Sequence, residues 1–168
     1  MPPTLELRRL ALGAQMHDVG KIGVPDRILT KPEKLTPEEF EVIKVHATRG
    51  YEIACSVKAL EPAAEAIYLH HERVDGTGYP LGLVGDQIPL HARIVSVADA
   101  YDAMTSGRVY QPAVSHDEAI RELRGSSGTH FDAEVVEVFA GVMERLGGNE
   151  PPVAQPPAPQ PSGRFQAA

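Results

Sequence analysis

The chain of 168 residues contains no tryptophan and one cysteine, and only 5% of its residues are aromatic. A single cysteine cannot form an internal disulfide, so Cys55, which lies among apolar neighbours, is expected to be a small core residue. No apolar run approaches the ~20 residues that a membrane-spanning helix needs, and no signal-peptide pattern follows Met1. These absences favour a cytoplasmic location.

Basic residues are also scarce. The 16 Lys and Arg residues are outnumbered by 23 Asp and Glu residues, which gives a formal net charge of −7. A broad electrostatic grip on long nucleic acid comes from clustered Lys and Arg, so the composition argues against such a partner. A phosphate-bearing substrate would need local cations instead. Bound divalent metals could supply them, and seven histidines with many acidic residues could hold the metals.

No stretch alternates with the two-residue period of a strand, and no internal repeat is present. Apolar residues recur at helical spacing instead, so we expect an all-α fold with one domain over residues 1–146. Helices are expected at residues 5–16, 36–57, 62–69, 90–104, 116–123 and 132–142, and residues 23–32 are expected to form a loop. Residues 147–168 are dense in proline and are expected to form an extended, mobile tail.

The segment from His70 to Pro80 reads His-His-Glu-Arg-Val-Asp-Gly-Thr-Gly-Tyr-Pro. Its two adjacent imidazoles end a predicted helix, where neighbours point about 100° apart, so they could reach two different points of one pocket. The glycines let the backbone approach a ligand closely, and Pro80 stiffens the exit of the loop. A metal cluster with a substrate loop beside it fits this pattern, and a helix cap followed by a turn fits it equally well.

Candidate metal ligands occur at or near predicted helix ends or on inward helix faces: His17, Asp18, His46, His70, His71 and Asp99. Each has a structural alternative, such as helix capping for the His-Asp pair, a hydrogen-bonded place at the core edge for His46, and a salt bridge to Arg93 for Asp99. His116 is expected to face solvent in the first turn of its helix. Together the six candidates supply ligands for two divalent ions, with Asp18 placed to bridge them. Nitrogen and oxygen donors without thiolates suit Mn, Fe, Zn, Co or Ni.

The same groups belong to a longer series of motifs between about Leu5 and Val142: His17-Asp18-Val19-Gly20-Lys21, His46, His70-His71-Glu72, Asp75-Gly76-Thr77-Gly78-Tyr79-Pro80, Ile88-Pro89, Ala92-Arg93-Ile94, Val97-Ala98-Asp99, Asp102-Ala103, and Arg108 with Tyr110. This series closely resembles the HD-GYP family of bacterial cyclic di-GMP phosphodiesterases, a branch of the HD-domain metal phosphohydrolases. The His-Asp pair alone would indicate only the wider superfamily. The Gly-Tyr-Pro loop in register with the rest narrows the resemblance to this branch.

The resemblance implies an HD-domain helical bundle in which the six candidate ligands hold two or three divalent ions, iron or manganese. It implies Asp18 and Lys21 as catalytic residues, and it assigns these residues to the substrate site: Lys21, Gly78, Tyr79, Pro80, Asp102, Arg108 and Gln111. The implied reaction is hydrolysis of cyclic di-GMP to linear pGpG, GMP or both by a metal-bridged hydroxide. The alternatives are a non-catalytic module that binds nucleotide or a GGDEF-domain protein, and a hydrolase of another nucleotide.

Three departures from the family pattern bear on these expectations. The family has an earlier helix that carries a further histidine and often a glutamate for the metals, whereas no histidine precedes His17 here. We therefore expect a fold without that first helix, one metal site short of a ligand, and a longer protein with an upstream sensory or receiver domain. Gln111 stands where a basic residue is usual, which weakens the expected phosphate grip, and Ala133 replaces the usual proline.

Overall fold

The computed structural model describes residues 4–106 and 112–146. Within these ranges it has no strand and only two isolated β-bridges, so the predicted all-α class is confirmed. The helices are α1 (Leu5–Met16), η1 (Val19–Gly23), α2 (Asp26–Leu29), α3 (Pro37–Ser56), η2 (Glu61–Ala63), α4 (Ala64–Leu69), η3 (Gly85–Gln87), α5 (Leu90–Ser106), α6 (His116–Gly125) and α7 (Ala133–Arg145), where η marks a 3-10 helix. The proline-dense segment 147–168 lies outside the described residues.

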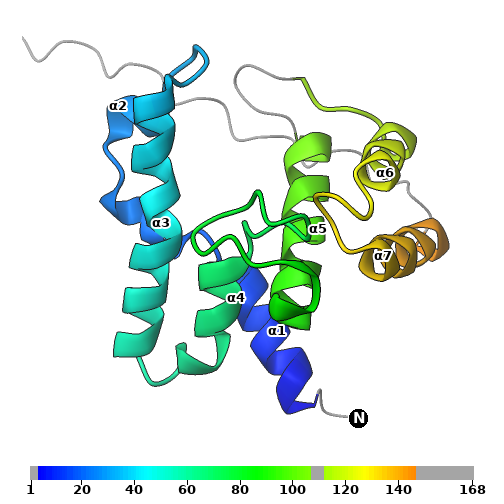
Figure 1. Ribbon diagram of the computed structural model, residues 1–168, viewed down its shortest axis with the longest axis horizontal. Helices are drawn as coiled ribbons and strands as arrows, with labels where there is room; N and C mark the ends of the chain where they lie inside the picture. The colour runs from blue at the N-terminus through cyan, green and yellow to red at the C-terminus, as the bar shows by residue number, and fades with distance from the viewer. Residues whose placement is uncertain (1–3, 107–111, 147–168) are drawn as a thin grey trace, which may run out of the picture.

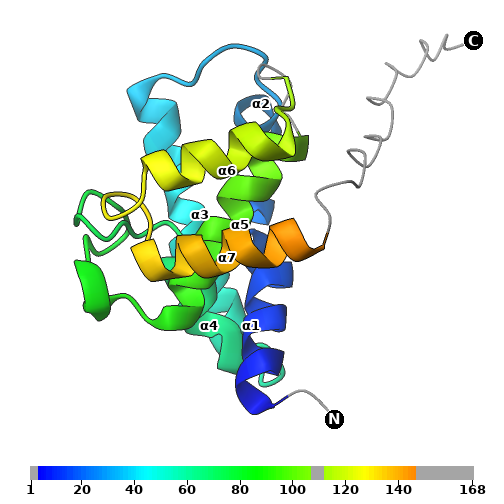
Figure 2. The same ribbon diagram turned by 90° about the vertical axis from the view of Figure 1, so that its right-hand side faces the viewer.

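Helix α5 lies in the middle of the molecule, with α1, α3 and α4 on one side of it and α6 and α7 on the other (Figure 1). Helices α6 and α7 lie side by side across the face of α5 (Figure 2), and each contacts it. One core cluster joins α5, α6 and α7 around Val97, Leu123 and Val136. A second joins α3 and α4 around Ala54 and Ile67. None of the described helices is long and apolar enough to cross a membrane.

Three helices begin at the cap residues that the sequence indicates. Thr36 accepts the backbone N–H of Glu39, and the Glu39 carboxylate accepts the N–H of Thr36 in return. Ser115 and Glu118 form the same reciprocal pair at α6, and Asp132 accepts two backbone N–H groups at α7. Each cap satisfies N–H groups that have no partner inside the helix and stabilises it by about 1 kcal/mol.

Several apolar residues that the sequence places in the core are exposed in the structure. Cys55 is exposed rather than buried, so its assignment to the core was wrong. Phe40 and Val57, expected on the buried stripe of α3, are 44% and 42% exposed, and Leu5 and Leu7 of α1 are 61% and 54% exposed. The buried residues of α3 run only from His46 to Ala54, so helical periodicity predicts the correct face of the helix but not how far along it the covering extends.

Two local expectations also need correction. The segment 23–32, expected to be a loop, contains α2, whose Ile28 is buried. His116, expected to face solvent, is half-buried, and its Nδ1 lies 2.9 Å from the hydroxyl oxygen of Tyr101. A short helix and a side-chain hydrogen bond to a distant helix both depend on tertiary neighbours, which the local sequence does not indicate.

Candidate metal centre

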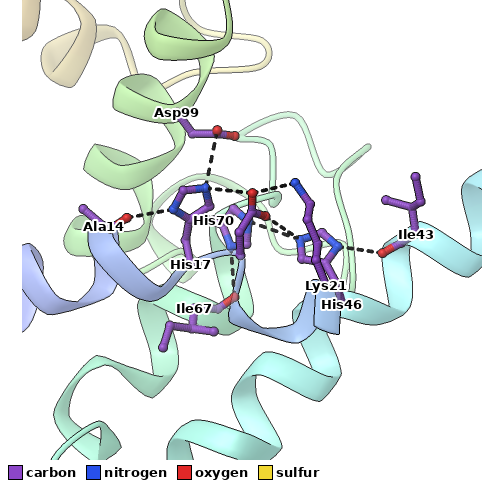
Figure 3. A network of polar contacts seen from close by, with 9 residues as sticks. Ala14, His17, Lys21, Ile43, His46, Ile67, His70 and Asp99 are labelled. Carbon is purple, nitrogen blue, oxygen red and sulfur yellow. Dashed lines mark hydrogen bonds and ion pairs between the residues drawn. The ribbon is translucent and has the colours of Figure 1, made fainter. Parts of the chain in front are cut away.

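The six residues predicted as metal ligands come together where α1, α3, α4 and α5 meet. His17 follows the last residue of α1, and its Nε2 lies 3.4 Å from Asp18 Oδ2 and 3.5 Å from Asp99 Oδ1. His46, from the middle of α3, has its Nε2 3.6 Å from Asp18 Oδ1. His17, His46, His70 and Asp99 converge from separate helices (Figure 3). The tertiary fold therefore brings together groups that are up to about eighty residues apart in the chain.

Gly20 allows this convergence. A Cβ atom at this position would lie 2.0 Å from the carbonyl oxygen of His46 and 2.5 Å from the backbone nitrogen of Gly50. Any side chain would therefore push η1 away from α3. With glycine, η1 packs directly on the α3 backbone, and Asp18 at its start reaches His46.

Three of the imidazoles are held in one tautomer. The Nδ1 atoms of His17, His46 and His70 lie 2.8, 2.6 and 2.9 Å from the carbonyl oxygen three residues earlier in the chain (Figure 3). A carbonyl oxygen can only accept, so each Nδ1 carries the proton and donates it. In the neutral ring this leaves a lone pair on Nε2, and a backbone anchor on the other nitrogen is the usual arrangement for a metal-binding histidine.

Burial keeps the inner imidazoles neutral. His46 and His70 are 0% and 1% exposed, and loss of solvent lowers the pKa of each. Their Nε2 atoms nevertheless lie only 3.5 Å apart. The His71 ring is centred 4.0 Å from that of His70 and 5.0 Å from that of His46, and burial lowers its pKa as well. Neutral rings that direct lone pairs toward one point provide a site for a cation.

The carboxylates are ionised despite their partial burial. Burial acts to raise the pKa of Asp18, but hydrogen bonds from His17 and Lys21 outweigh it and hold the pKa below its usual value. Burial and the His17 hydrogen bond oppose each other in the same way at Asp99, whose pKa is also lowered. Hydrogen bonds to Asp18 and Asp99 in turn raise the pKa of His17 to about 10. A metal ion bound here would compete with the His17 proton.

The donor set fits divalent metal ions. His46, His70 and His71 each offer one ligand atom, and these atoms lie within 4.8 Å of one another. His17, Asp18 and His70 form a second such group. Nitrogen and carboxylate oxygen donors are suited to first-row divalent ions, and here the imidazoles of His46, His70 and His71 are neutral while the carboxylates are ionised. The cluster therefore has the chemistry of a metal site.

The predicted Gly-Tyr-Pro loop lies against this cluster. The ring of Tyr79 stacks on that of His71, with centroids 4.7 Å apart and an interplanar angle of 28°. The Tyr79 N–H donates to the His71 carbonyl oxygen at 3.1 Å, and the peptide bond to Pro80 is cis. A Cβ atom at Gly78 would lie 2.3 Å from the backbone nitrogen of Arg73, so only glycine fits there.

Glu72 holds this loop in place and is a residue whose role the sequence did not reveal. Its side chain is buried, 3% exposed, and accepts the backbone N–H groups of Leu81 at 2.6 Å and Leu83 at 2.9 Å. The carboxylate therefore ties the far side of the loop to the residue after the tandem histidines. Its place between those histidines and a glycine-rich loop was the only signal, and the same place would suit an exposed glutamate.

Asp102, another predicted substrate residue, has no described contact with the cluster. Asp102 is exposed, and its Oδ1 accepts a hydrogen bond from the Ser106 hydroxyl at 3.2 Å. Lys21, by contrast, lies at the cluster, with its Nζ 2.5 Å from Asp18 Oδ2. Arg108 and Gln111 lie outside the described residues.

The alternative explanation for Asp99, a salt bridge to Arg93, is wrong. Arg93 pairs with Asp132 at 2.5 Å and with Asp86 at 3.2 Å, while Asp99 contacts His17. Arg93 and Asp132 line a cavity of about 540 Å³ between α5 and α7. None of the six cluster residues lines this cavity.

Residues 1–135 match the HD domain family, and the chain belongs to it. A cyclic di-GMP phosphodiesterase of Thermotoga maritima is 48% identical over 139 residues, which are 82% of this chain and 38% of that protein. One of Vibrio cholerae is 46% identical over 152 residues, which are 86% of this chain and 30% of that protein. The chain thus spans about a third of the length of these relatives. Relatives at 36–39% identity are named 3′3′-cGAMP-specific phosphodiesterases.

A solved structure shows the same fold. It is an HD-GYP protein of Bdellovibrio bacteriovorus with a TM-score of 0.64 and 23% sequence identity, and the match covers 81% of this chain and 43% of that one. The resemblance to the HD-GYP branch, drawn from the order of motifs in the sequence, is confirmed by these comparisons.

Proposed function

We propose that this domain is a metal-dependent phosphodiesterase that hydrolyses cyclic di-GMP to linear pGpG, GMP or both. The observation that carries the proposal is the convergence of four imidazoles and two carboxylates on one cluster, with the Lys21 ammonium group at its edge. Five relatives at 42–48% identity support the choice of substrate, because the name of each includes cyclic di-GMP phosphodiesterase.

In this proposal the metal ligands are His17, Asp18, His46, His70, His71 and Asp99, and they hold two or three divalent ions, iron or manganese. When bound, such ions lower the pKa of a coordinated water and neutralise charge that develops on a phosphodiester. The anchored Nδ1 atoms of His17, His46 and His70 support the assignment, since they keep each ring oriented before a metal arrives.

The protein's own groups would bind and orient the substrate. Asp18 accepts hydrogen bonds from His17 and Lys21, which orient its carboxylate, and its Oδ1 lies 3.6 Å from His46 Nε2. Lys21 is 35% exposed, so its ammonium group can donate to a non-bridging phosphate oxygen while it remains near Asp18. We also assign substrate contacts to Gly78, Tyr79, Pro80, Asp102, Arg108 and Gln111.

The test combines metal analysis with product analysis. The protein is supplied anaerobically with iron or manganese, its metal content is measured, and its products with cyclic di-GMP are separated by chromatography. We expect about two ions per chain and conversion to linear pGpG or GMP. A protein that takes up no metal, or that binds metal and leaves cyclic di-GMP intact, contradicts the proposal and supports the alternative of a non-catalytic module.

A second substrate is favoured by one finding, the relatives named for 3′3′-cGAMP. The same metal-loaded protein is therefore assayed with both cyclic dinucleotides. We expect a higher kcat/KM for cyclic di-GMP, and a higher value for 3′3′-cGAMP would reverse the substrate assignment. Cyclic di-GMP is the small-molecule partner that we propose, whereas a GGDEF-domain partner and an upstream sensory or receiver domain stay predictions.

A further inference from the structure

We propose that Phe40 and Lys44 of α3 form, together with Tyr79, a subsite that holds one guanine base of the substrate. The inference rests on the proposed function, since a cyclic dinucleotide cleaved at the cluster must place its bases beside it. None of the family motifs identified in the sequence includes Phe40 or Lys44. Their place next to the centre is a property of the tertiary structure.

A row of aromatic rings leads outward from the cluster. Tyr79 stacks on His71, one of the cluster imidazoles, with centroids 4.7 Å apart. Phe40 meets Tyr79 edge to face, with centroids 6.2 Å apart and an interplanar angle of 85°. Phe40 is 44% exposed, which leaves part of its ring open to a ligand. Phe40 is thus separated from the candidate metal centre by Tyr79 alone, and an exposed aromatic ring in this position is a suitable platform for stacking of a planar base.

Lys44 places a positive charge at the same platform. It follows Phe40 by four residues and so lies on the same face of α3. Its Nζ lies 5.1 Å from the centroid of Phe40 and 5.6 Å from that of Tyr79. Its ion pair with Glu41 is 2.6 Å long, but Glu41 is 67% exposed and such pairs contribute little. The ammonium group can therefore turn from Glu41 to a bound base.

This combination selects for guanine. Guanine presents two acceptors, N7 and O6, along one edge, whereas adenine presents an acceptor and an amino donor there. An ammonium group has three donors and no acceptor, so it matches the guanine edge and meets a donor on adenine. Aromatic stacking, in contrast, tolerates either base. Phe40 would thus contribute affinity for a base, and Lys44 the preference for guanine.

The experiment uses the metal-free chain, so that its readout does not depend on catalysis. Isothermal titration calorimetry measures the affinity of the protein for GMP, AMP and ribose 5-phosphate, which has no base. The variants are Phe40→Leu, which removes the ring but keeps an apolar side chain, and Lys44→Gln. The matched control is Tyr51→Leu, because Tyr51 is 37% exposed on α3 and lies about 16 Å further along the helix.

We expect the unmodified protein to bind GMP more tightly than AMP, and AMP more tightly than ribose 5-phosphate. Phe40→Leu should weaken GMP binding about tenfold without changing ribose 5-phosphate binding. Lys44→Gln should remove the preference for GMP over AMP, and Tyr51→Leu should change none of these affinities.

The subsite is refuted if the affinity of Phe40→Leu for GMP is within twofold of that of the unmodified protein. It is also refuted if the unmodified protein binds GMP no more tightly than ribose 5-phosphate. Hydrolysis of cyclic di-GMP by the metal-loaded, unmodified protein is measured separately. The absence of hydrolysis together with Phe40-dependent GMP binding would refute the enzyme and not the subsite. Hydrolysis with Phe40-independent binding would refute only the subsite.

Discussion

The Nε2 atoms of His46 and His70 lie 3.5 Å apart, and both rings are buried. The other nitrogen of each ring donates to a backbone carbonyl oxygen, so neither ring can turn away. Two lone pairs at this distance repel each other unless a proton or a metal ion lies between them. Burial lowers both pKa values and disfavours the proton, which makes a metal ion the better partner.

Asp18→Ala is expected to abolish metal loading and turnover together. Asp18 lies within 3.6 Å of both His17 and His46, so it is the carboxylate best placed to serve two ions. The measurement is metal content by elemental analysis, alongside hydrolysis of cyclic di-GMP. Asp117→Ala, an exposed carboxylate on α6, is the control and should leave both unchanged. Turnover retained in Asp18→Ala contradicts the assignment of this residue.

Glu72→Gln is expected to release the Gly-Tyr-Pro loop while the metal ligands stay in place. The glutamine amide keeps one oxygen acceptor but turns its NH₂ group toward the other backbone N–H. One of the N–H groups of Leu81 and Leu83 therefore loses its partner, which lowers the free energy of unfolding by about 2 kcal/mol. We expect a higher KM for cyclic di-GMP with unchanged metal content. Glu52→Gln, exposed on α3, is the control. A KM equal to that of the unmodified protein would show that Glu72 does not position the loop.

Gly20→Ala is expected to lower the free energy of unfolding by about 3 kcal/mol or more and to reduce metal binding. The added Cβ would meet the His46 carbonyl oxygen at 2.0 Å, and backbone atoms cannot move aside as a flexible side chain can. Denaturant unfolding and elemental analysis provide the measurements. Gly125→Ala is the matched control, because a Cβ there meets nothing within 4 Å. Equal stability of the two variants would argue against the close packing of η1 on α3.

Asp132→Asn is expected to destabilise the protein at pH 7, and the effect is expected to diminish as the pH falls below the ordinary aspartate pKa near 4. Hydrogen bonds from the backbone N–H groups of Val135 and Glu134, together with Arg93, outweigh burial and hold the pKa of Asp132 below its usual value. A lowered pKa contributes stability that is present above the ordinary value near 4 and is lost as pH falls through the lower, folded-state value. Asparagine keeps the cap but not the charge.

The measurement for Asp132 is the free energy of unfolding in urea across this pH range. Asp117→Asn is the control, since Asp117 is exposed in the first turn of α6. A difference between Asp132→Asn and the unmodified protein that persists unchanged at the lowest pH would exclude the Arg93 ion pair as its cause.

The sequence predicted most of the helices, because capping and periodicity are local. Thr36 and Ser115 begin α3 and α6 as their capping boxes predict. Local patterns did not predict exposure: Cys55 and Phe40 were expected in the core and are exposed. Whether an apolar side chain on the correct helix face is covered depends on how far the neighbouring helix extends.

For the cluster, residue types and order were sufficient to name six candidates, because imidazoles and carboxylates at helix ends and on inward helix faces can be identified in the sequence. The packing of α1 against α5 decided that Asp99 contacts His17 rather than Arg93. The same holds for Glu72, whose role depends on a loop that folds back over it. By itself the sequence determined most of the helices and the available donor groups, since both follow from neighbours in the chain. Only the tertiary structure decided which donors share a site and which aromatic ring lies beside it, because those distances are set by packing between segments far apart in the chain.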